Sequence, residues 1–165
     1  MLQKSLFGGP DTEVTKKIVF RCIEARYSRL VLREDAPAWV SQTRFTSAKQ
    51  VYELLMDLVY EAKEHFITLH LDGKNRIACI DRVSTGSLNQ CLVVPREIFK
   101  TALISSAAAI LLVHNHPTGD PAPSREDITV TQRLKEAGEL LGVRVLDHII
   151  VGDGQYYSFA EGGLL

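Results

Sequence analysis

An apolar run that stops at a pair of histidines constrains this fold more than any other stretch of the chain. Residues 107–113 are apolar at every position, and His114, Asn115 and His116 follow them directly. A strand covered on both faces is apolar at both parities, and a run of this length is too short for a typical helix. We therefore predict that residues 107–113 form a central strand with polar residues at its exit.

The spacing of the polar residues after this run is typical of metal ligands. Residues two apart in a strand point to the same face, so His114 and His116 present both imidazoles on one side. A turn rich in proline and glycine follows, Ser124 can cap the next helix, and Asp127 lies one turn into it. The carboxylate of Asp127 can then face back toward the imidazoles. This ligand set leaves the fourth position of a tetrahedral Zn²⁺ open for water, as in catalytic zinc sites.

Each half of this pattern is common by itself, whereas the combination is not. Strands often carry exposed histidines, and a serine three residues before an aspartate is an ordinary helix start. A plain helix entry does not need a pair of imidazoles facing it, so the joint pattern predicts that His114, His116 and Asp127 bind one Zn²⁺ per chain. The sequence lacks the H-x-E and P-C-x-x-C pair of zinc deaminases and the local signatures of serine or cysteine nucleophiles.

Composition narrows the cellular setting and the partners. A chain of 165 residues with 45% hydrophobic residues can bury the core of one domain without disulfides. Its net charge of -1 gives no overall attraction for nucleic acid. The cysteines match neither a disulfide framework nor a zinc motif, and no apolar run is long enough to span a bilayer. We therefore expect a cytoplasmic protein with reduced thiols and no membrane segment, for which nucleic acid is not a favoured partner.

The first part of the chain carries few structural signals. Residues 1–13 are rich in glycine, proline and polar residues without a period, residues 14–32 alternate weakly as a strand would, and the lone Trp39 lies in an irregular connector. We divide the chain into an N-terminal arm with possible edge strands, residues 1–44, and one domain that contains the metal-ligand pattern, residues 45–165.

The remaining elements alternate between helices and strands, with several hairpins. A capping box of Ser47 and Gln50 predicts the start of an amphipathic helix that ends near residues 63–64, and Gly142 ends a later helix as a left-handed cap. This order favours an α/β fold of the α+β type, with a mixed, largely antiparallel sheet flanked by helices, over a doubly wound parallel fold. Beyond the central strand, we expect strands at 65–71, 76–83, 91–94, 143–151 and 156–159, a turn at 72–75, a polar loop at 84–90, and helices at 95–104 and 124–141, the last of which buries Ile128, Leu134, Ala137 and Leu141.

The metal-ligand pattern carries a resemblance to a known family. H-x-H-P at residues 114–117, followed by S-x-x-D at residues 124–127, resembles the JAMM (MPN+) motif of metal-dependent isopeptidases and deubiquitinases. The longer strings HNHPTGDPAPSRED, EHFITLHLDGKNR and LLGVRVLDHIIVGDG resemble the RadC-like branch of that family over residues 45–159. The resemblance implies the JAB/MPN architecture, which is cytidine-deaminase-like, in a short stand-alone form without the helix-hairpin-helix region of full-length RadC proteins.

The resemblance further implies a zinc-dependent hydrolase that cleaves peptide or isopeptide bonds with a metal-bound water. His114, His116 and Asp127 would hold the zinc ion, and Ser124 would donate a hydrogen bond to the developing oxyanion. The substrate would be a peptide or protein. The polar loop at 84–90 is placed to hold an extended substrate segment beside the sheet as an added strand.

The general base comes from a different part of the chain. The resemblance implies a glutamate on or before the strand that follows the first helix, and Glu64 stands at that position. Glu61 is the alternative in the same connection, and Glu97 on the following helix is a more distant one. In this role the glutamate takes a proton from the attacking water and delivers it to the leaving amine.

Several other polar residues have open roles. His148 could orient a ligand, although a plain structural hydrogen bond in a strand is favoured. Asp120 and Asp147 fit either turns or support of a ligand, and His65 and His70 have no partners at ligand spacing. The alternative function is a non-catalytic domain that interacts with protein or DNA in DNA repair or genome maintenance. A homo-oligomer is compatible with either function.

Overall fold

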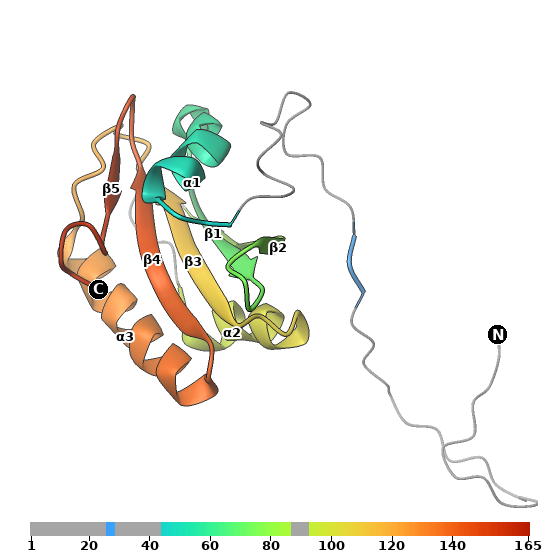
Figure 1. The fold of residues 1–165 in the computed structure, drawn as a ribbon. Coiled ribbons are helices and arrows are strands. Elements are labelled where there is room, and N and C mark those ends of the chain that lie inside the picture. Colours follow the sequence, from blue (N-terminus) through green and yellow to red (C-terminus); the bar gives the residue numbers. More distant parts are fainter. Residues whose placement is uncertain (1–25, 29–43, 87–92) are drawn as a thin grey trace, which may run out of the picture.

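The computed structural model describes residues 26–28, 44–86 and 93–165 (Figure 1). The connector around Trp39 and most of the expected strand at 14–32 lie outside these residues, and the described residues 26–28 are not in a strand. In the described part of the chain, no helix is long and apolar enough to cross a membrane.

The strands of the described part form one mixed sheet in the order β2-β1-β3-β4-β5. The pairs β1–β2, β1–β3 and β4–β5 are antiparallel, and β3–β4 is parallel. This arrangement confirms the expected α/β fold with a mixed, largely antiparallel sheet. The strands are β1 (Glu64–Leu71), β2 (Ile77–Gly86), β3 (Ala109–Asn115), β4 (Arg144–Val151) and β5 (Tyr156–Ser158). The helices are α1 (Ala48–Leu55), the 3-10 helix η2 (Met56–Tyr60), α2 (Pro95–Ile104) and α3 (Arg125–Leu141).

Strand β3 is the centre of the sheet because its sequence is apolar on both faces. All residues from Ala109 to Asn115 are buried, and β1 and β4 pair with β3 on its two sides. The antiparallel pairing with β1 places Phe66 opposite His114. The predicted central strand is confirmed, although it lies two residues further along the chain than residues 107–113.

Helices cover both faces of the sheet and bury two apolar clusters (Figure 1). Odd-numbered residues of β1 and β3, such as Leu69 and Leu111, pack against α1 and η2. Even-numbered residues, such as Phe66 and Leu112, pack against α2 and α3. This division follows from the two-residue period of a strand. Because each fully buried leucine contributes roughly 1.5–3 kcal/mol, the clusters stabilise the sheet on both sides. His114 shares the even-numbered face, so the predicted site lies on the α2 and α3 side.

The first helix differs from the expectation in its length and its cap. α1 ends at Leu55 and continues as η2, which stops short of residues 63–64. Ser47 is the N-cap residue, but its side chain makes no capping hydrogen bond. Gln50 Oε1 instead accepts from the N–H and the hydroxyl of Thr46, at 2.9 and 3.2 Å. The predicted capping box of Ser47 and Gln50 was therefore wrong, because Thr46 offers two donors to the same amide oxygen.

The segment between β1 and α2 is also more regular at its start than expected. Residues 84–86, which were assigned to a polar loop at 84–90, pair with the first residues of β1 and extend β2. The loop prediction was wrong for these residues because β1 begins early enough to provide them with a partner. Residues 87–92 lie outside the described part. Of the expected strand at 91–94, the described residues 93 and 94 are not in a strand.

Helix α3 ends where predicted, but its buried face is narrower than the predicted one. Gly142 caps it in the left-handed conformation, with φ 72°. Leu134 is fully buried and Ala137 packs against the same cluster, as expected. Ile128 and Leu141 are 39% and 42% exposed, so their predicted burial was wrong. They lie in the first and last turns of the helix, where the stripe centred on Leu134 leaves the core.

Candidate metal centre

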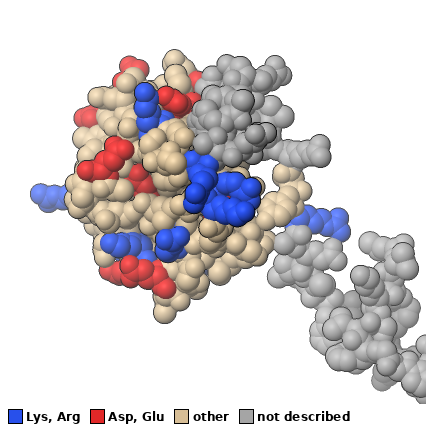
Figure 2. All heavy atoms as spheres, in the orientation of Figure 1, with Lys and Arg blue, Asp and Glu red and all other residues tan. Residues whose placement is uncertain are grey.

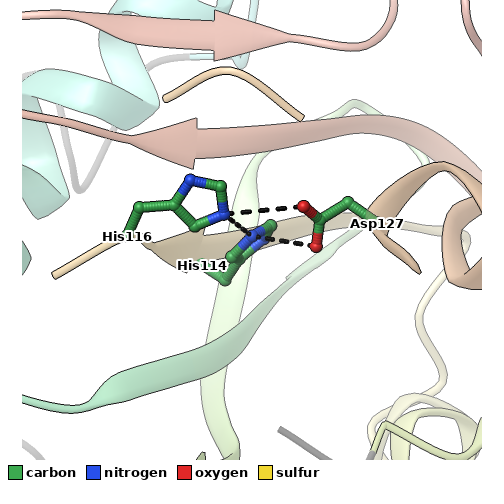
Figure 3. Close-up of side chains that lie close together, drawn as sticks. All are labelled: His114, His116 and Asp127. Carbon is green, nitrogen blue, oxygen red and sulfur yellow. Dashed lines mark hydrogen bonds and ion pairs between the residues drawn. The ribbon is translucent and has the colours of Figure 1, made fainter. Parts of the chain in front are cut away.

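The exit of β3 and the first turn of α3 bring the predicted ligands together (Figure 3). His114 Nε2 lies 3.0 Å from His116 Nε2 and 3.3 Å from Asp127 Oδ1. His116 Nε2 lies 3.5 Å from Asp127 Oδ2. His114 is buried, whereas His116 and Asp127 are partly exposed, so the cluster is open to solvent on one side.

These distances fit the geometry of a tetrahedral metal site. Nitrogen and oxygen ligands at about 2.0–2.1 Å from zinc are separated from one another by about 3.3–3.4 Å. The separations of 3.0 to 3.5 Å between the ligand atoms of His114, His116 and Asp127 bracket that value. The residues present can therefore hold a metal ion with little rearrangement.

Hydrogen bonds to the outer ring nitrogens aim both imidazoles at the centre. His116 Nδ1 donates to the main-chain oxygen of Asp120 at 2.7 Å, because a carbonyl oxygen can only accept. His114 Nδ1 lies 2.8 Å from His148 Nε2. Both histidines consequently turn Nε2 toward Asp127, in the arrangement that metal-bound histidines commonly show.

His148 supports His114 from the interior of the fold. It is fully buried, and its Nδ1 lies 2.6 Å from Thr131 Oγ1. Burial lowers the pKa of His148 well below its ordinary value, so the ring is neutral at pH 7. The sequence pattern favoured a plain structural role for His148, but its partner is a predicted ligand. The parallel register of β3 and β4, which sets Leu112 opposite His148, brings the two rings together and could not be read from the sequence.

The N-terminus of α3 holds the carboxylate of Asp127. Asp127 Oδ2 accepts from the main-chain N–H and the hydroxyl of Ser124, at 2.8 and 2.6 Å, and Ser124 Oγ accepts from the Asp127 N–H at 3.1 Å. This is the complete capping box that the spacing indicated. Burial alone would raise the pKa of Asp127, but the adjoining imidazoles of His114 and His116, with the Ser124 hydroxyl, outweigh it and hold the pKa far below its ordinary value.

The region that contains this cluster matches a known protein family. A sequence model described as the RadC-like JAB domain matches residues 45–164. The chain belongs to this family. The UPF0758 protein of Geotalea uraniireducens is 55% identical over 145 residues, which cover 87% of this chain and 63% of that protein. The UPF0758 protein of Pelobacter propionicus is 60% identical over 123 residues, or 74% of this chain and 54% of that protein.

A relative from a third organism has a similar identity. The UPF0758 protein of Methanosarcina mazei is 54% identical over 123 residues, covering 74% of this chain and 54% of that protein. The chain thus spans between 54% and 63% of the length of these curated relatives. The matched residues make up only part of each relative.

The RadC-like resemblance implied Glu64 as the general base, and Glu64 is the first residue of β1. Phe66 pairs with His114 at the end of the β1–β3 ladder, and Glu64, two residues before Phe66, lies on the same face of the sheet. The pKa of His116 is raised, first by its hydrogen bond with Asp127 and, against the opposing effect of burial, also by the negative charge of Glu64. The carboxylate is therefore electrostatically coupled to the cluster, while its role as a base stays a prediction.

The alternative glutamates make contacts elsewhere. Glu61 Oε2 lies 3.5 Å from Nε2 of His65, whose side chain leaves β1 on the face opposite to that of Glu64. Glu97 is partly exposed on α2 and pairs with Lys100 at 2.5 Å. Among the three candidates, Glu64 is thus the one that the strand register brings to the RadC-like ligand cluster.

Asn115, between the two histidines, holds the main chain around Glu64. Its side chain is fully buried, its Oδ1 accepts from the His65 N–H at 2.8 Å, and its Nδ2 donates to the Lys63 oxygen at 3.0 Å. We did not predict this role from the sequence. Alternation along β3 indicated that the Asn115 side chain points away from the imidazoles, but not which backbone groups it meets.

The other polar candidates have structural partners. The side chain of Asp120 accepts from the Ala122 N–H at 2.9 Å within the turn, so Asp120 reaches the centre only through its main-chain oxygen. Asp147 accepts from Ser158 Oγ at 2.6 Å and ties β4 to the C-terminal hairpin. His70 bonds to Ser105 and other polar groups near the opposite end of β1, away from the ligand cluster.

Proposed function

We propose that this domain is a zinc-dependent hydrolase of peptide or isopeptide bonds. The observation that carries the proposal is the spacing of His114, His116 and Asp127, which matches a tetrahedral site, beside a glutamate on the same sheet face. Membership of the RadC-like JAB domain family supports it. A zinc ion bound there lowers the pKa of a water molecule and polarises a substrate carbonyl.

Glu64 supplies the proton transfer in this proposal. Glu64 lies on the sheet face of His114, and in this proposal its carboxylate reaches the solvent-open side of the cluster, where water and substrate would enter. The carboxylate accepts a proton from the attacking water and delivers it to the nitrogen of the leaving amine. A positioned acid–base group of this kind contributes about 10²–10⁴ in rate.

Ser124 has two proposed roles that a single variant separates. In the structure its hydroxyl donates to Asp127 Oδ2, so a developing oxyanion would compete with Asp127 for the same proton. Loss of the cap in Ser124→Ala lowers stability by about 1 kcal/mol. If Ser124 also stabilises the oxyanion, kcat falls by about 10²–10³. A kcat that stays at the parent value in a folded, zinc-loaded Ser124→Ala protein would leave the cap as its function.

The substrate segment fits beside strand β2. In the described part of the sheet, β2 is an outer strand, and its last residue, Gly86, pairs with Glu64. An extended peptide that adds to this edge would run toward the ligand cluster, with main-chain hydrogen bonds providing affinity. We therefore propose a peptide or protein tail as the substrate.

Paired variants of the two glutamates test this function. Zinc-loaded parent protein, Glu64→Gln and the matched control Glu61→Gln are incubated with peptide libraries and isopeptide-linked conjugates, and the products are identified by mass spectrometry. Glu64→Gln should lose about 10²–10⁴ of the rate while it still binds one zinc ion, and Glu61→Gln should keep the parent rate. Full activity of Glu64→Gln would overturn the mechanism.

A non-catalytic role in binding DNA is the second candidate, and one surface feature favours it. Figure 2 shows mixed charges over the viewed face with one group of adjoining basic side chains. Arg44 donates to the Lys74 oxygen at 2.9 Å and forms a β-bridge with Arg76, so basic residues gather at the β1–β2 turn. Arg76 is paired with Asp72 at 2.7 Å, which reduces this charge. Tight DNA binding with a steep salt dependence would favour this role over hydrolysis.

A further inference from the structure

A chain of hydrogen bonds joins two of the metal ligands through the protein interior. His114 Nδ1 lies 2.8 Å from His148 Nε2, and His148 Nδ1 lies 2.6 Å from Thr131 Oγ1. Thr131 Oγ1 lies 2.5 Å from the main-chain oxygen of Asp127. This series of hydrogen bonds therefore starts on the ring of His114 and ends on the main chain of Asp127.

The acceptor at the end of this chain sets the direction of every bond. The Asp127 main-chain oxygen can only accept, so it takes the single hydroxyl proton of Thr131. Thr131 Oγ1 must then accept from Nδ1 of His148, which leaves Nε2 of the neutral His148 ring as an acceptor. His114 Nδ1 consequently carries a proton and donates it to His148. In the neutral His114 ring, Nε2 then carries the lone pair that a metal ion needs.

The opposite direction would block metal binding. If His148 donated from Nε2, His114 would carry its proton on Nε2, which lies 3.3 Å from Asp127 Oδ1. That proton would occupy the position of the ion. The Thr131 hydroxyl is the group that prevents this reversal, because its proton is already committed to Asp127.

Packing keeps this series of hydrogen bonds, from His114 through His148 and Thr131 to Asp127 and called the relay below, in place. Thr131 is 1% exposed and His148 is 0% exposed, so bulk water does not compete for these bonds. The His148 ring stacks on Phe159 at 4.8 Å between centroids, and Phe66 stacks on His114 at 5.9 Å. Both imidazoles are thus held in one orientation by aromatic neighbours.

We propose that His148 and Thr131 are positioning residues that select the metal-binding tautomer of His114 before any ion arrives. The inference rests on the proposed metal site and adds to it two residues that never contact the ion. The relay also fixes the distance between the end of β3 and the first turn of α3, which carry the ligands. Loss of such outer partners typically lowers metal affinity about 10–100-fold.

The matched pair Thr131→Val and Thr131→Ser tests the relay. The valine variant keeps the shape and removes the hydroxyl, whereas the serine variant keeps the hydroxyl. Zinc affinity is measured by competition with a chelating dye, with circular dichroism to verify the fold. Thr131→Val should bind zinc about 10–100-fold more weakly, and Thr131→Ser should stay within a few-fold of the parent. Parent-like affinity in folded Thr131→Val would overturn the proposal.

A second measurement needs no metal and distinguishes the relay from the proposed function. Long-range proton–nitrogen NMR on the metal-free parent should show the Nδ1-protonated tautomer of the neutral His114 ring, and Thr131→Val should show a mixture of tautomers. A parent that fails to bind zinc would refute the proposed function, while the tautomer result would still decide the relay. If Thr131→Val does not fold, His148→Gln, which retains a donor and an acceptor, is compared with His148→Leu. Equal zinc affinity of these two would overturn the proposal.

Discussion

His65 donates its main-chain N–H to Asn115 Oδ1 at 2.8 Å, a bond that joins the strand of the proposed base to the strand of two ligands. The side-chain Nδ2 of Asn115 in turn donates to the Lys63 oxygen at 3.0 Å. The residues on both sides of Glu64 are therefore tied to the residue between the histidines. The distance from carboxylate to ligand cluster depends on this one buried side chain.

Asn115→Ala should separate catalysis from metal binding. The variant leaves the His65 N–H and the Lys63 oxygen without their partner, which costs about 1–3 kcal/mol of unfolding free energy. A displacement of Glu64 by about 1 Å can cost about 10²-fold in rate, so kcat/KM should fall by that order while zinc affinity changes far less. The measurements are peptide cleavage and zinc titration on the same preparation. Unchanged kcat/KM would show that Asn115 does not place Glu64.

Zinc should stabilise the parent protein against heat, since a ligand that binds only the folded state adds to its stability. At free zinc about 100-fold above Kd the gain is about 2.7 kcal/mol, equivalent to a rise in Tm of roughly 5–15 °C. His116→Ala removes a ligand and should lose this rise, with its Tm insensitive to zinc and to chelator. Differential scanning calorimetry with and without zinc provides the comparison. A zinc-dependent rise of equal size in His116→Ala would place the ion elsewhere.

Gly138→Ala should destabilise the fold although alanine is the better helix former. A Cβ on Gly138 would meet the main-chain oxygen of Val143 and come within 3.2 Å of the Phe99 ring, where neither neighbour can move freely. Overpacking of this kind costs about 1–3 kcal/mol. Gly73→Ala, in the β1–β2 turn, has nothing within 4 Å and is the matched control. Urea denaturation should show a lower midpoint for Gly138→Ala alone, and equal midpoints would contradict the close packing of α3 on the sheet.

The β1–β2 turn should lose stability in acid through Asp72. Hydrogen bonds from the main-chain N–H and then the side chain of Arg76, with a further one from the Lys74 N–H, lower the pKa of Asp72 from 3.8 to about 2. Because the folded pKa is the lower one, the stabilising effect is complete above the ordinary value and disappears as the pH falls from about 4 to about 2. The urea midpoints of parent and Asp72→Asn should differ at pH 7 and converge near pH 2. An NMR titration that found an ordinary pKa for Asp72 would contradict this.

The local parts of the fold and site could be predicted because each depends on neighbours in sequence. The apolar run before His114 specifies β3, and the spacing of Ser124 and Asp127 specifies the start of α3. The end of α1 at Leu55 was not predictable, since the apolar pattern continues beyond it while the backbone changes to a 3-10 helix. Tertiary packing decides such boundaries.

The contacts that support the ligands depend on strand register and were harder to predict. The partner of His148 follows from the parallel pairing of β3 and β4, and no local pattern in the sequence specifies that register. Thr131 could have been noticed, because it follows Asp127 at the four-residue spacing that places two side chains on one helix face. Asn115 needed the position of β1 as well.

The proposed ion site and the proposed base come from separate stretches of the polypeptide. β3, α3 and β4 are consecutive and carry all three ligands together with Thr131 and His148, whereas Glu64 belongs to β1. The proposed ligands and the two residues that support His114 therefore lie in one continuous β-α-β stretch, separate in sequence from the glutamate. Under the proposed function, a change confined to the start of β1 would remove the base and leave the ion site in place.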